Sequence, residues 1–317
     1  MTRVDELRLI ARVARMYYEW NMRQAEIARQ LGISQATISR LLTRSKLEGI
    51  IRISVNIPNG VYTELEENLV KKYHLRDAIV VDCLENNETV IQRDIGASAA
   101  YYLESILRPN DVIGISSWSA TLLALVDALH NIPAKPGIRV VQILGGVGSP
   151  GSEVHATRLT LRLASLLNGK AIFLPAPGVV GSEAAMQVLL QDEYVKEVTT
   201  LFDQVTLALV GIGAVEPSAL LAESGNVFSV HELEHLHQQG AVGDILLRFF
   251  DQAGRPVDTN LEKRVISMTL EQLSRVDRAI GAAGGARKYV AISGALRGGW
   301  INILVTDQFT AQRLLAE

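Results

Sequence analysis

Hydroxyl, amide and basic side chains recur at helical spacing between residues 34 and 44. No Asp or Glu occurs between Arg29 and Lys46. On a helix that fits the major groove, Gln and Arg can pair with base edges, and Ser, Thr and Lys can hold phosphates. The pattern therefore predicts contacts to duplex DNA. The contact residues predicted in this stretch are Ser34, Gln35, Ala36, Thr37, Ser39, Arg40, Thr43 and Arg44.

Residues 23–45 supply the elements that would position these side chains. Apolar or small residues fall at the i, i+3, i+4 spacing, so each of two short helices has one inward face. Gly32 can adopt the left-handed conformation that ends the first helix, and Ser34 is a good N-cap for the second. Together these features indicate a helix-turn-helix. A small helical hairpin with a solvated polar face is the alternative.

Several short apolar runs end in small polar residues and glycines, and these ends indicate a site for a small ligand. Hydroxyls and free N–H groups at a helix start can bind an anion, and glycines let the backbone approach a ligand. A plain helix cap at Ser119 or Thr121, and ordinary turns at the glycines, are the alternatives. The candidate ligand residues in these loops are Ser117, Trp118, Ser119, Thr121, Gly145, Gly146, Gly148, Gly211 and Gly213.

Two charged residues complete this candidate ligand site. Lys288 follows the tract AGGAR at the predicted end of a strand, where its ammonium group could bind a phosphate. Asp244 could accept hydrogen bonds from sugar hydroxyls. A solvated surface charge is the alternative at both positions.

The histidines and the cysteine give weaker signals. His231, His235 and His237 stand in HELEHLH, which is not the HExxH order of zinc proteases, so a solvated helix face is the preferred interpretation. Cys83 is the only cysteine, and nothing near it in the sequence marks an activated thiol. We therefore expect no metal, no cofactor and no catalytic residue.

Charge is distributed unevenly along the 317 residues. Residues 1–52 contain ten Lys and Arg against five Asp and Glu, whereas the rest contains 21 against 29. A basic head on an acidic body suits a protein that touches a polyanion at one end. No apolar run approaches the ~20 residues that span a bilayer, and the charged N-terminus is no signal peptide. These features indicate a cytoplasmic protein without membrane contact.

The hydrophobic pattern predicts two domains. Residues 49–57 alternate like a strand and predict a wing beside the helices, from which Arg52 could reach a phosphate. Pro58, Asn59 and Gly60 mark the boundary, giving domains of residues 1–57 and 58–317.

Seven apolar runs alternate with helical stretches in the second domain, which predicts an α/β fold with a parallel sheet. The tract QAG predicts one hairpin turn in addition. The runs are residues 78–82, 112–116, 140–144, 171–174, 205–213, 278–284 and 301–307.

Several tracts, in order along the whole chain, resemble those of the SorC/DeoR-type sugar-binding bacterial transcriptional regulators. The tracts are QAEIARQLGISQATISRLL, SSWSATL, ILGGVGS, LPAPGVV, LVGIGAV, GDILLRFFD, GALRGGWINILVTD and TAQRLL. The resemblance implies an N-terminal winged helix-turn-helix and a Rossmann-like effector domain related in fold to sugar-phosphate isomerases and deaminases. It also implies homotetramers, a palindromic DNA operator and a free or phosphorylated sugar as inducer. The sequence itself leaves a dimer or a tetramer open.

The resemblance also assigns residues to the ligand. The family's phosphate loop, Ser-Trp-Gly-x-Thr, is matched by residues 117–121, where Ser119 replaces the usual glycine. The family's acidic and basic sugar-contacting positions correspond to Asp244 and Lys288, and its glycine loop to Gly145, Gly146 and Gly148.

The leading hypothesis is a DNA-binding regulator of a carbohydrate-utilisation operon that a sugar or sugar phosphate controls. An isomerase- or deaminase-like enzyme with a DNA-binding head is the alternative, although no general base is tied by sequence to a ligand loop. A DNA-bound scaffold with a vestigial pocket is a third possibility.

Overall fold

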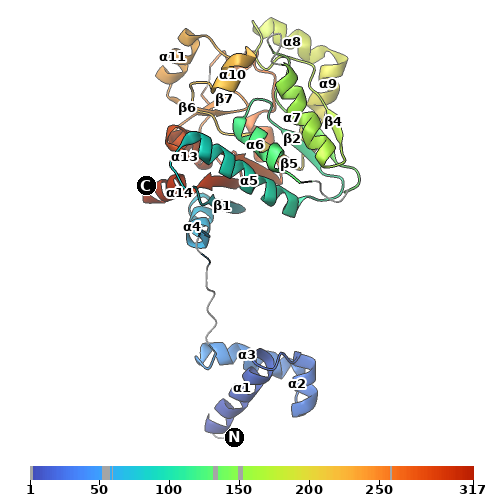
Figure 1. The fold of residues 1–317 in the computed structure, drawn as a ribbon, viewed down its shortest axis with the longest axis vertical. Coiled ribbons are helices and arrows are strands. Elements are labelled where there is room, and N and C mark those ends of the chain that lie inside the picture. The colour runs from blue at the N-terminus through green and yellow to red at the C-terminus, as the bar shows by residue number, and fades with distance from the viewer. Residues whose placement is uncertain (1–2, 52–57, 59, 131–134, 149–152, 258) are drawn as a thin grey trace. The chain divides into compact units, whose positions relative to one another are not determined.

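Two compact units make up the chain, Met1–Pro58 and Asn59–Glu317 (Figure 1). A computed structural model describes residues 3–51, 58, 60–130, 135–148, 153–257 and 259–317, and of residues 153–156 it describes the backbone alone. The predicted wing and its Arg52 fall on residues 52–57, outside the described residues.

The described part of the first unit is helical. It consists of α1 (Arg3–Tyr18), α2 (Gln24–Leu31) and α3 (Gln35–Leu47). Ile10, Val13 and Met16 of α1 are fully buried against Ile27 of α2 and Ile38 of α3. One apolar stripe per helix therefore suffices to make the small core.

The turn between α2 and α3 has the predicted geometry. Gly32 is left-handed at φ 64°, and its N–H donates to the carbonyl of Ala28. The Ser34 hydroxyl accepts the backbone N–H of Thr37 at 3.2 Å, so it caps α3 as predicted. Trp20 lies beyond the end of α1 and is 54% exposed, so it is not part of this core.

All seven predicted runs form strands of one sheet in the second unit, and every pairing in it is parallel. The strand order is β1-β9-β8-β5-β2-β3-β4. The strands are β1 (Asp77–Val81), β2 (Val112–Ile115), β3 (Arg139–Gln142), β4 (Lys170–Ile172), β5 (Leu207–Gly211), β8 (Arg278–Ala282) and β9 (Ile303–Asp307). We call the end at which these strands begin the amino edge and the opposite end the carboxyl edge.

Helices cover both faces of the sheet (Figure 1). On one face α5, α6 and α7 pack against strand residues such as Ile113 and Leu209; on the other, α4, α13 and α14 pack against residues such as Ala208 and Val210. The helices are α4 (Thr63–Tyr73), α5 (Glu88–Ile106), α6 (Ala120–Ala128), α7 (Glu153–Leu166), α8 (Glu183–Gln191), α9 (Glu193–Thr200), α10 (Ala219–Ser224), α11 (Val230–Gln238), α12 (Leu270–Ser274), α13 (Tyr289–Arg297) and α14 (Gln308–Ala316), with 3-10 turns η1 (Phe202–Gln204), η2 (Glu262–Arg264) and η3 (Ala286–Lys288). Burial on both faces explains why the strands read as continuous apolar runs.

An antiparallel pair, β6 (Ala241–Ile245) and β7 (Arg248–Asp251), stands apart from the main sheet. The predicted QAG turn is present, because Asp251 and Arg255 pair across it at 2.9 Å. A second turn, at Leu246 and Leu247, joins β6 to β7, and it was not predicted. Both leucines have positive φ, 58° and 63°, which is unfavourable for a side chain of this kind.

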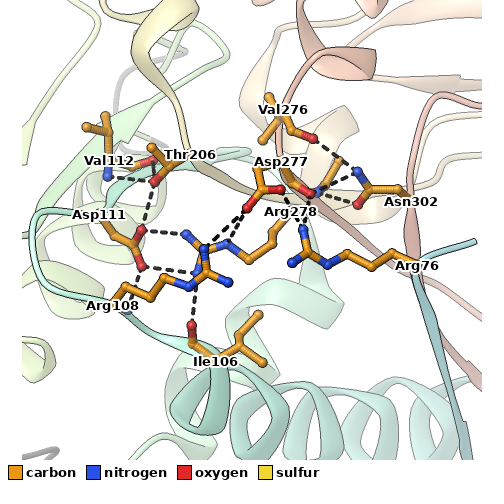
Figure 2. Close-up of polar contacts among 11 residues, drawn as sticks. Arg76, Ile106, Arg108, Asp111, Val112, Thr206, Val276, Asp277, Arg278 and Asn302 are labelled. Atoms are coloured by element: carbon orange, nitrogen blue, oxygen red, sulfur yellow. Dashed lines mark hydrogen bonds and ion pairs between the residues drawn. The ribbon is translucent and has the colours of Figure 1, made fainter.

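A network of charged and polar residues ties the amino edge together (Figure 2). Arg278 is 2% and Asp111 3% exposed, and they form an ion pair. Thr206 donates to Asp111 at 2.9 Å, and Arg278 donates to the carbonyl of Ile106 at 2.8 Å. We call this the amino-edge network; its residues are Arg76, Arg108, Asp111, Thr206, Asp277, Arg278 and Asn302.

Candidate functional site

The predicted DNA-contacting face of α3 lies at the surface of the first unit. Ser34, Gln35, Ala36, Ser39, Arg40 and Thr43 are exposed, and Thr37 and Arg44 are half-buried. Arg40 donates to the Thr37 hydroxyl at 3.3 Å, which orients its guanidinium along the helix. The buried side of α3 holds Ile38, Leu41 and Leu42. The helix therefore presents a polar face without carboxylates to solvent.

Arg44 differs from the other predicted contacts because its side chain has carboxylate partners within the unit. It forms an ion pair with Glu6 of α1 and a second with Glu48 at 3.3 Å. The hydrogen bond and charge of Arg44 lower the pKa of Glu6. In this structure Arg44 therefore ties α3 to α1.

A cleft opens at the carboxyl edge of the large sheet, between β2 and β5. From β2 the chain continues outward through β3 and β4, whereas from β5 it continues the other way through β8 and β9. Open α/β sheets bind ligands at such a switch point. The cleft has a volume of about 70 Å³, which is small beside the roughly 300–1,000 Å³ typical of small-molecule sites. We call it the switch-point cleft; it is lined by Gln92, Ser116, Trp118, Ser119, Ala120, Leu144, Gly211, Ile212, Gly213, Ala214, Glu216, Pro217, Ser218, Leu221, Asp244, Leu246, Leu247, Arg287 and Lys288.

Two glycines after β5 let polar side chains approach the backbone. A Cβ at Gly213 would lie 2.2 Å from a carboxylate oxygen of Asp244, and one at Gly211 would lie 2.8 Å from the Ser119 hydroxyl. Gly213 and Asp244 also exchange both backbone hydrogen bonds, at 2.9 and 3.0 Å. The predicted glycines therefore position Asp244 and Ser119 at the cleft.

Asp244 and Lys288 are the charged pair of the cleft. Burial raises the pKa of Asp244 to about 6, against the opposing effects of the Leu247 N–H and the charge of Lys288. Burial also lowers the pKa of Lys288, and neighbouring Arg287 adds to this effect. The Asp244 carboxylate accepts the Leu247 N–H at 2.9 Å. This hydrogen bond, with burial of both leucine side chains, offsets the unfavourable backbone of the Leu246–Leu247 turn.

Two charged side chains in the lining of the switch-point cleft have partners outside that lining. Arg287 contacts Glu88 at the start of α5 at 3.0 Å, and Glu216 contacts His237 of α11 at 2.8 Å. The polar and charged lining residues that were not predicted from the sequence are Gln92, Ser116, Glu216, Ser218 and Arg287. Arg287 could have been predicted as a ligand residue because it adjoins Lys288 in the chain. Gln92 lies in the middle of an ordinary helical stretch, where nothing in the sequence marks it as part of a ligand site.

The structure brings Trp118, Ser119, Gly211, Gly213, Asp244 and Lys288 to the cleft and leaves the other candidate ligand residues outside its lining. Ser117 is buried, donates to the carbonyl of Leu144 at 2.7 Å and accepts from Gln142 at 2.9 Å. Thr121 is buried at the start of α6. Gly145 and Gly146 allow close packing against Pro177 and Gln142, and Gly148 also lies outside the lining.

The described residues show neither a metal-binding cluster nor a membrane-spanning helix. They contain no group of three or more His, Cys, Asp or Glu side chains placed to hold a metal ion. None of the helices described combines the length and hydropathy needed to cross a bilayer. Cys83 is buried, and burial raises the pKa of its thiol to about 12.

Comparison with known proteins places the chain in a family. Residues 59–316 match the family model described as "Putative sugar-binding domain". The sorbitol operon regulator of Klebsiella pneumoniae is 34% identical over 319 residues, which cover 99% of this chain and 100% of that protein. The chain belongs to the SorC/DeoR-type family of sugar-binding transcriptional regulators.

The relation to SorC/DeoR-type proteins covers both units. The deoxyribonucleoside regulator of Bacillus subtilis is 32% identical over 311 residues, covering 98% of each chain. The crystal structure of the full-length sorbitol operon regulator from Klebsiella pneumoniae superimposes with a TM-score of 0.73 and 33% identity, covering 98% of this chain and 99% of that one. Every residue lining the switch-point cleft falls within the family's sugar-binding domain.

Proposed function

We propose that this SorC/DeoR-type chain is a DNA-binding transcriptional regulator of a carbohydrate-utilisation operon, controlled by a sugar or sugar phosphate in the switch-point cleft. Residues 1–57 act as the DNA-binding domain, in which α2 and α3 form the helix-turn-helix. Residues 58–317 act as a Rossmann-like effector and oligomerisation domain related to the sugar-phosphate isomerases. The protein works in the cytoplasm and catalyses no reaction. One observation carries the proposal: a single chain holds both an acid-free exposed helix face and a charged cleft at a topological switch point.

In the proposed complex, α3 lies in the major groove. Gln35 and Arg40 read base edges, while Ser34, Ser39 and Thr43 contact phosphates, because these side chains are exposed. Arg44 remains a predicted DNA contact. Its ion pairs with Glu6 and Glu48 support a further part in fixing α3 against α1.

Ligand recognition in this proposal uses the charged pair of the cleft. Lys288 holds an anionic or hydroxyl oxygen, and Asp244 accepts hydrogen bonds from sugar hydroxyls. Ser119 and the exposed edges of Gly211 and Gly213 complete the contacts. The loops that carry these contacts are held in place by residues outside the cleft lining, namely Ser117, Thr121, Gly145 and Gly146.

Control of DNA binding requires two copies of the chain. Two recognition helices of a dimer enter successive major grooves about 34–36 Å apart. A ligand can change this spacing only by binding one arrangement of the effector domains more tightly than the other. A dimer or a tetramer of the chain would supply that arrangement.

DNA binding is tested by titrating fluorescent duplexes of the protein's own promoter region and of a scrambled sequence. Arg40→Ala should lose about 1–3 kcal/mol of affinity for the promoter and discriminate less between the duplexes. Arg12→Ala, which removes the same charge from an exposed position of α1, is the matched control and should retain the preference. A wild-type protein without salt-sensitive preference for its promoter would refute the proposal.

An enzyme is the second candidate. The raised pKa of Asp244, about 6, beside Lys288 in a cleft is a feature that general acid–base catalysts share. Incubating the protein with a panel of sugar phosphates and following the sugar by NMR separates the candidates. Turnover that Asp244→Asn abolishes would favour the enzyme, whereas binding without turnover favours the regulator.

A further inference from the structure

The rim of the switch-point cleft contains a cation whose present partner lies outside the cleft. Arg287 lines the cleft, and its Nη2 lies 3.0 Å from Oε1 of Glu88. Gln92, also in the lining, donates to the same oxygen at 3.2 Å. Glu88 itself is not part of the lining. A single carboxylate thus holds two of the cleft's hydrogen-bond donors against the first turn of α5.

The Arg287–Glu88 pair is accessible to solvent, with side chains 39% and 45% exposed. Exposed ion pairs contribute little to stability, because water screens the charges and both side chains lose freedom. A guanidinium binds a carboxylate or phosphate more strongly when it can do so bidentately and away from bulk water. An anionic group within the cleft would therefore compete successfully with Glu88 for Arg287.

The charges around Arg287 allow this exchange. Lys288 adjoins it, and each of the two cations raises the local potential that an anion meets. Asp244 already accepts the Leu247 N–H, and Glu216 is paired with His237 at 2.8 Å. Neither of these carboxylates has a hydrogen bond to Arg287 among those described. Glu88 is then the carboxylate that competes directly with an anionic ligand.

We propose that Arg287 is a specificity-determining residue of the cleft, which exchanges Glu88 for an anionic group of the ligand, and that Glu88 acts as a built-in competitor. This inference rests on the proposed function, because it assumes that the cleft binds the effector. It extends that function by making affinity for charged over neutral ligands depend on a residue outside the cleft. Removing Glu88 should strengthen anion binding, and removing Arg287 should weaken it.

The experiment uses the full-length protein with inorganic phosphate as the probe, titrated calorimetrically at constant ionic strength. Glu88→Gln should lower the dissociation constant about 3- to 10-fold, whereas Arg287→Gln should raise it at least about 10-fold. The double variant should bind more like Arg287→Gln than like Glu88→Gln, because the direct competition that Glu88 exerts is for Arg287. D-glucose, as a neutral probe, should show no dependence on either substitution.

Glu67→Gln is the matched control, because Glu67 forms an exposed ion pair with Lys71 on α4 and lies outside the cleft lining. An equal gain in affinity from Glu67→Gln would mean that net charge alone is responsible, and would overturn the inference. Unchanged affinity in Glu88→Gln, or a wild-type protein that does not bind phosphate, would also overturn it. The promoter titration is independent of these outcomes, so failure of the inference is distinguishable from failure of the proposed regulator.

Discussion

The two edges of the large sheet use the same residue types for opposite purposes. At the amino edge, Asp111 and Arg278 are almost completely buried and form an ion pair (Figure 2). At the carboxyl edge, Asp244 and Lys288 line a cleft and share no direct hydrogen bond among those described. A charge that is paired within the protein supports the fold, whereas one that faces a cleft remains available to a ligand.

This contrast has an energetic consequence. The desolvation cost of the Asp111–Arg278 ion pair is met when the protein folds. Removing one partner leaves the other charge buried without a countercharge. The carboxyl edge instead keeps Asp244 in an environment that raises its pKa to about 6, which costs stability at neutral pH. Substitutions at the two edges should therefore change stability in opposite directions.

The largest effect is expected at the amino edge. Asp111→Asn should lower the free energy of unfolding by about 3–5 kcal/mol, because Arg278 loses its buried countercharge. Urea unfolding followed by circular dichroism measures it. A loss below about 1 kcal/mol would mean that Asp277, 3.6 Å from Arg278, compensates for the missing charge, and the contrast between the edges would fail.

A smaller effect of opposite sign is expected at the carboxyl edge. The pKa of Asp244 is raised from 3.8 to about 6, so the folded protein holds this proton more tightly than the unfolded chain. Its contribution to stability is therefore lost as pH rises from about 4 to about 6. Asp244→Asn should stabilise the ligand-free protein by about 1–3 kcal/mol near pH 8, with a gain that shrinks towards pH 4.

Urea unfolding at a series of pH values between about 4 and 8 tests this expectation. Glu67→Gln serves as a control, because it removes an exposed carboxylate on α4. If the gain in stability were the same at every pH, or if the variant were less stable near pH 8, then ionised Asp244 would not be what destabilises the folded protein.

The smallest effect is expected at the exposed end of the amino-edge network. Arg76 contacts Asp277 at 2.6 Å, but their side chains are 43% and 53% exposed. Arg76→Ala should therefore cost no more than about 1 kcal/mol, and less at high salt. Thermal unfolding at low and high salt would measure it. A cost comparable to that of Asp111→Asn would show that the network acts as one unit, which would sharpen the difference between the edges.

Local features of the fold were predictable from the sequence. Gly32 and Ser34 end and begin helices as predicted, because capping depends on the conformational freedom of one residue and the hydrogen bonds of its neighbours. The seven apolar runs became parallel strands, because burial on both faces imposes a continuous apolar pattern. The Leu246–Leu247 turn was missed, since neither leucine favours positive φ and only tertiary contacts hold it there.

The candidate site was predictable only in part, because its residues come from distant parts of the chain. Lys288 was singled out by its place after the tract AGGAR, and the resemblance to the SorC/DeoR-type regulators pointed to Lys288 and Asp244 together. Ser117 and Thr121, from the same loop as Ser119, turned inward and left Ser119 at the cleft. Which side chains of one loop face the core and which face the cleft depends on tertiary packing, and no local sequence pattern encodes that.

By itself, the sequence determined the order of helices and strands, the basic acid-free face of α3 and the loops from which a ligand site would be built. These features follow from periodicity, capping and residue type, which act over a few neighbouring positions. Tertiary structure alone decided the partners of the charges: Arg44 meets Glu6 from 38 residues away, and Arg287 meets Glu88 from 199 residues away. Electrostatic interactions depend on distance in space, and folding fixes that distance without regard to separation along the chain.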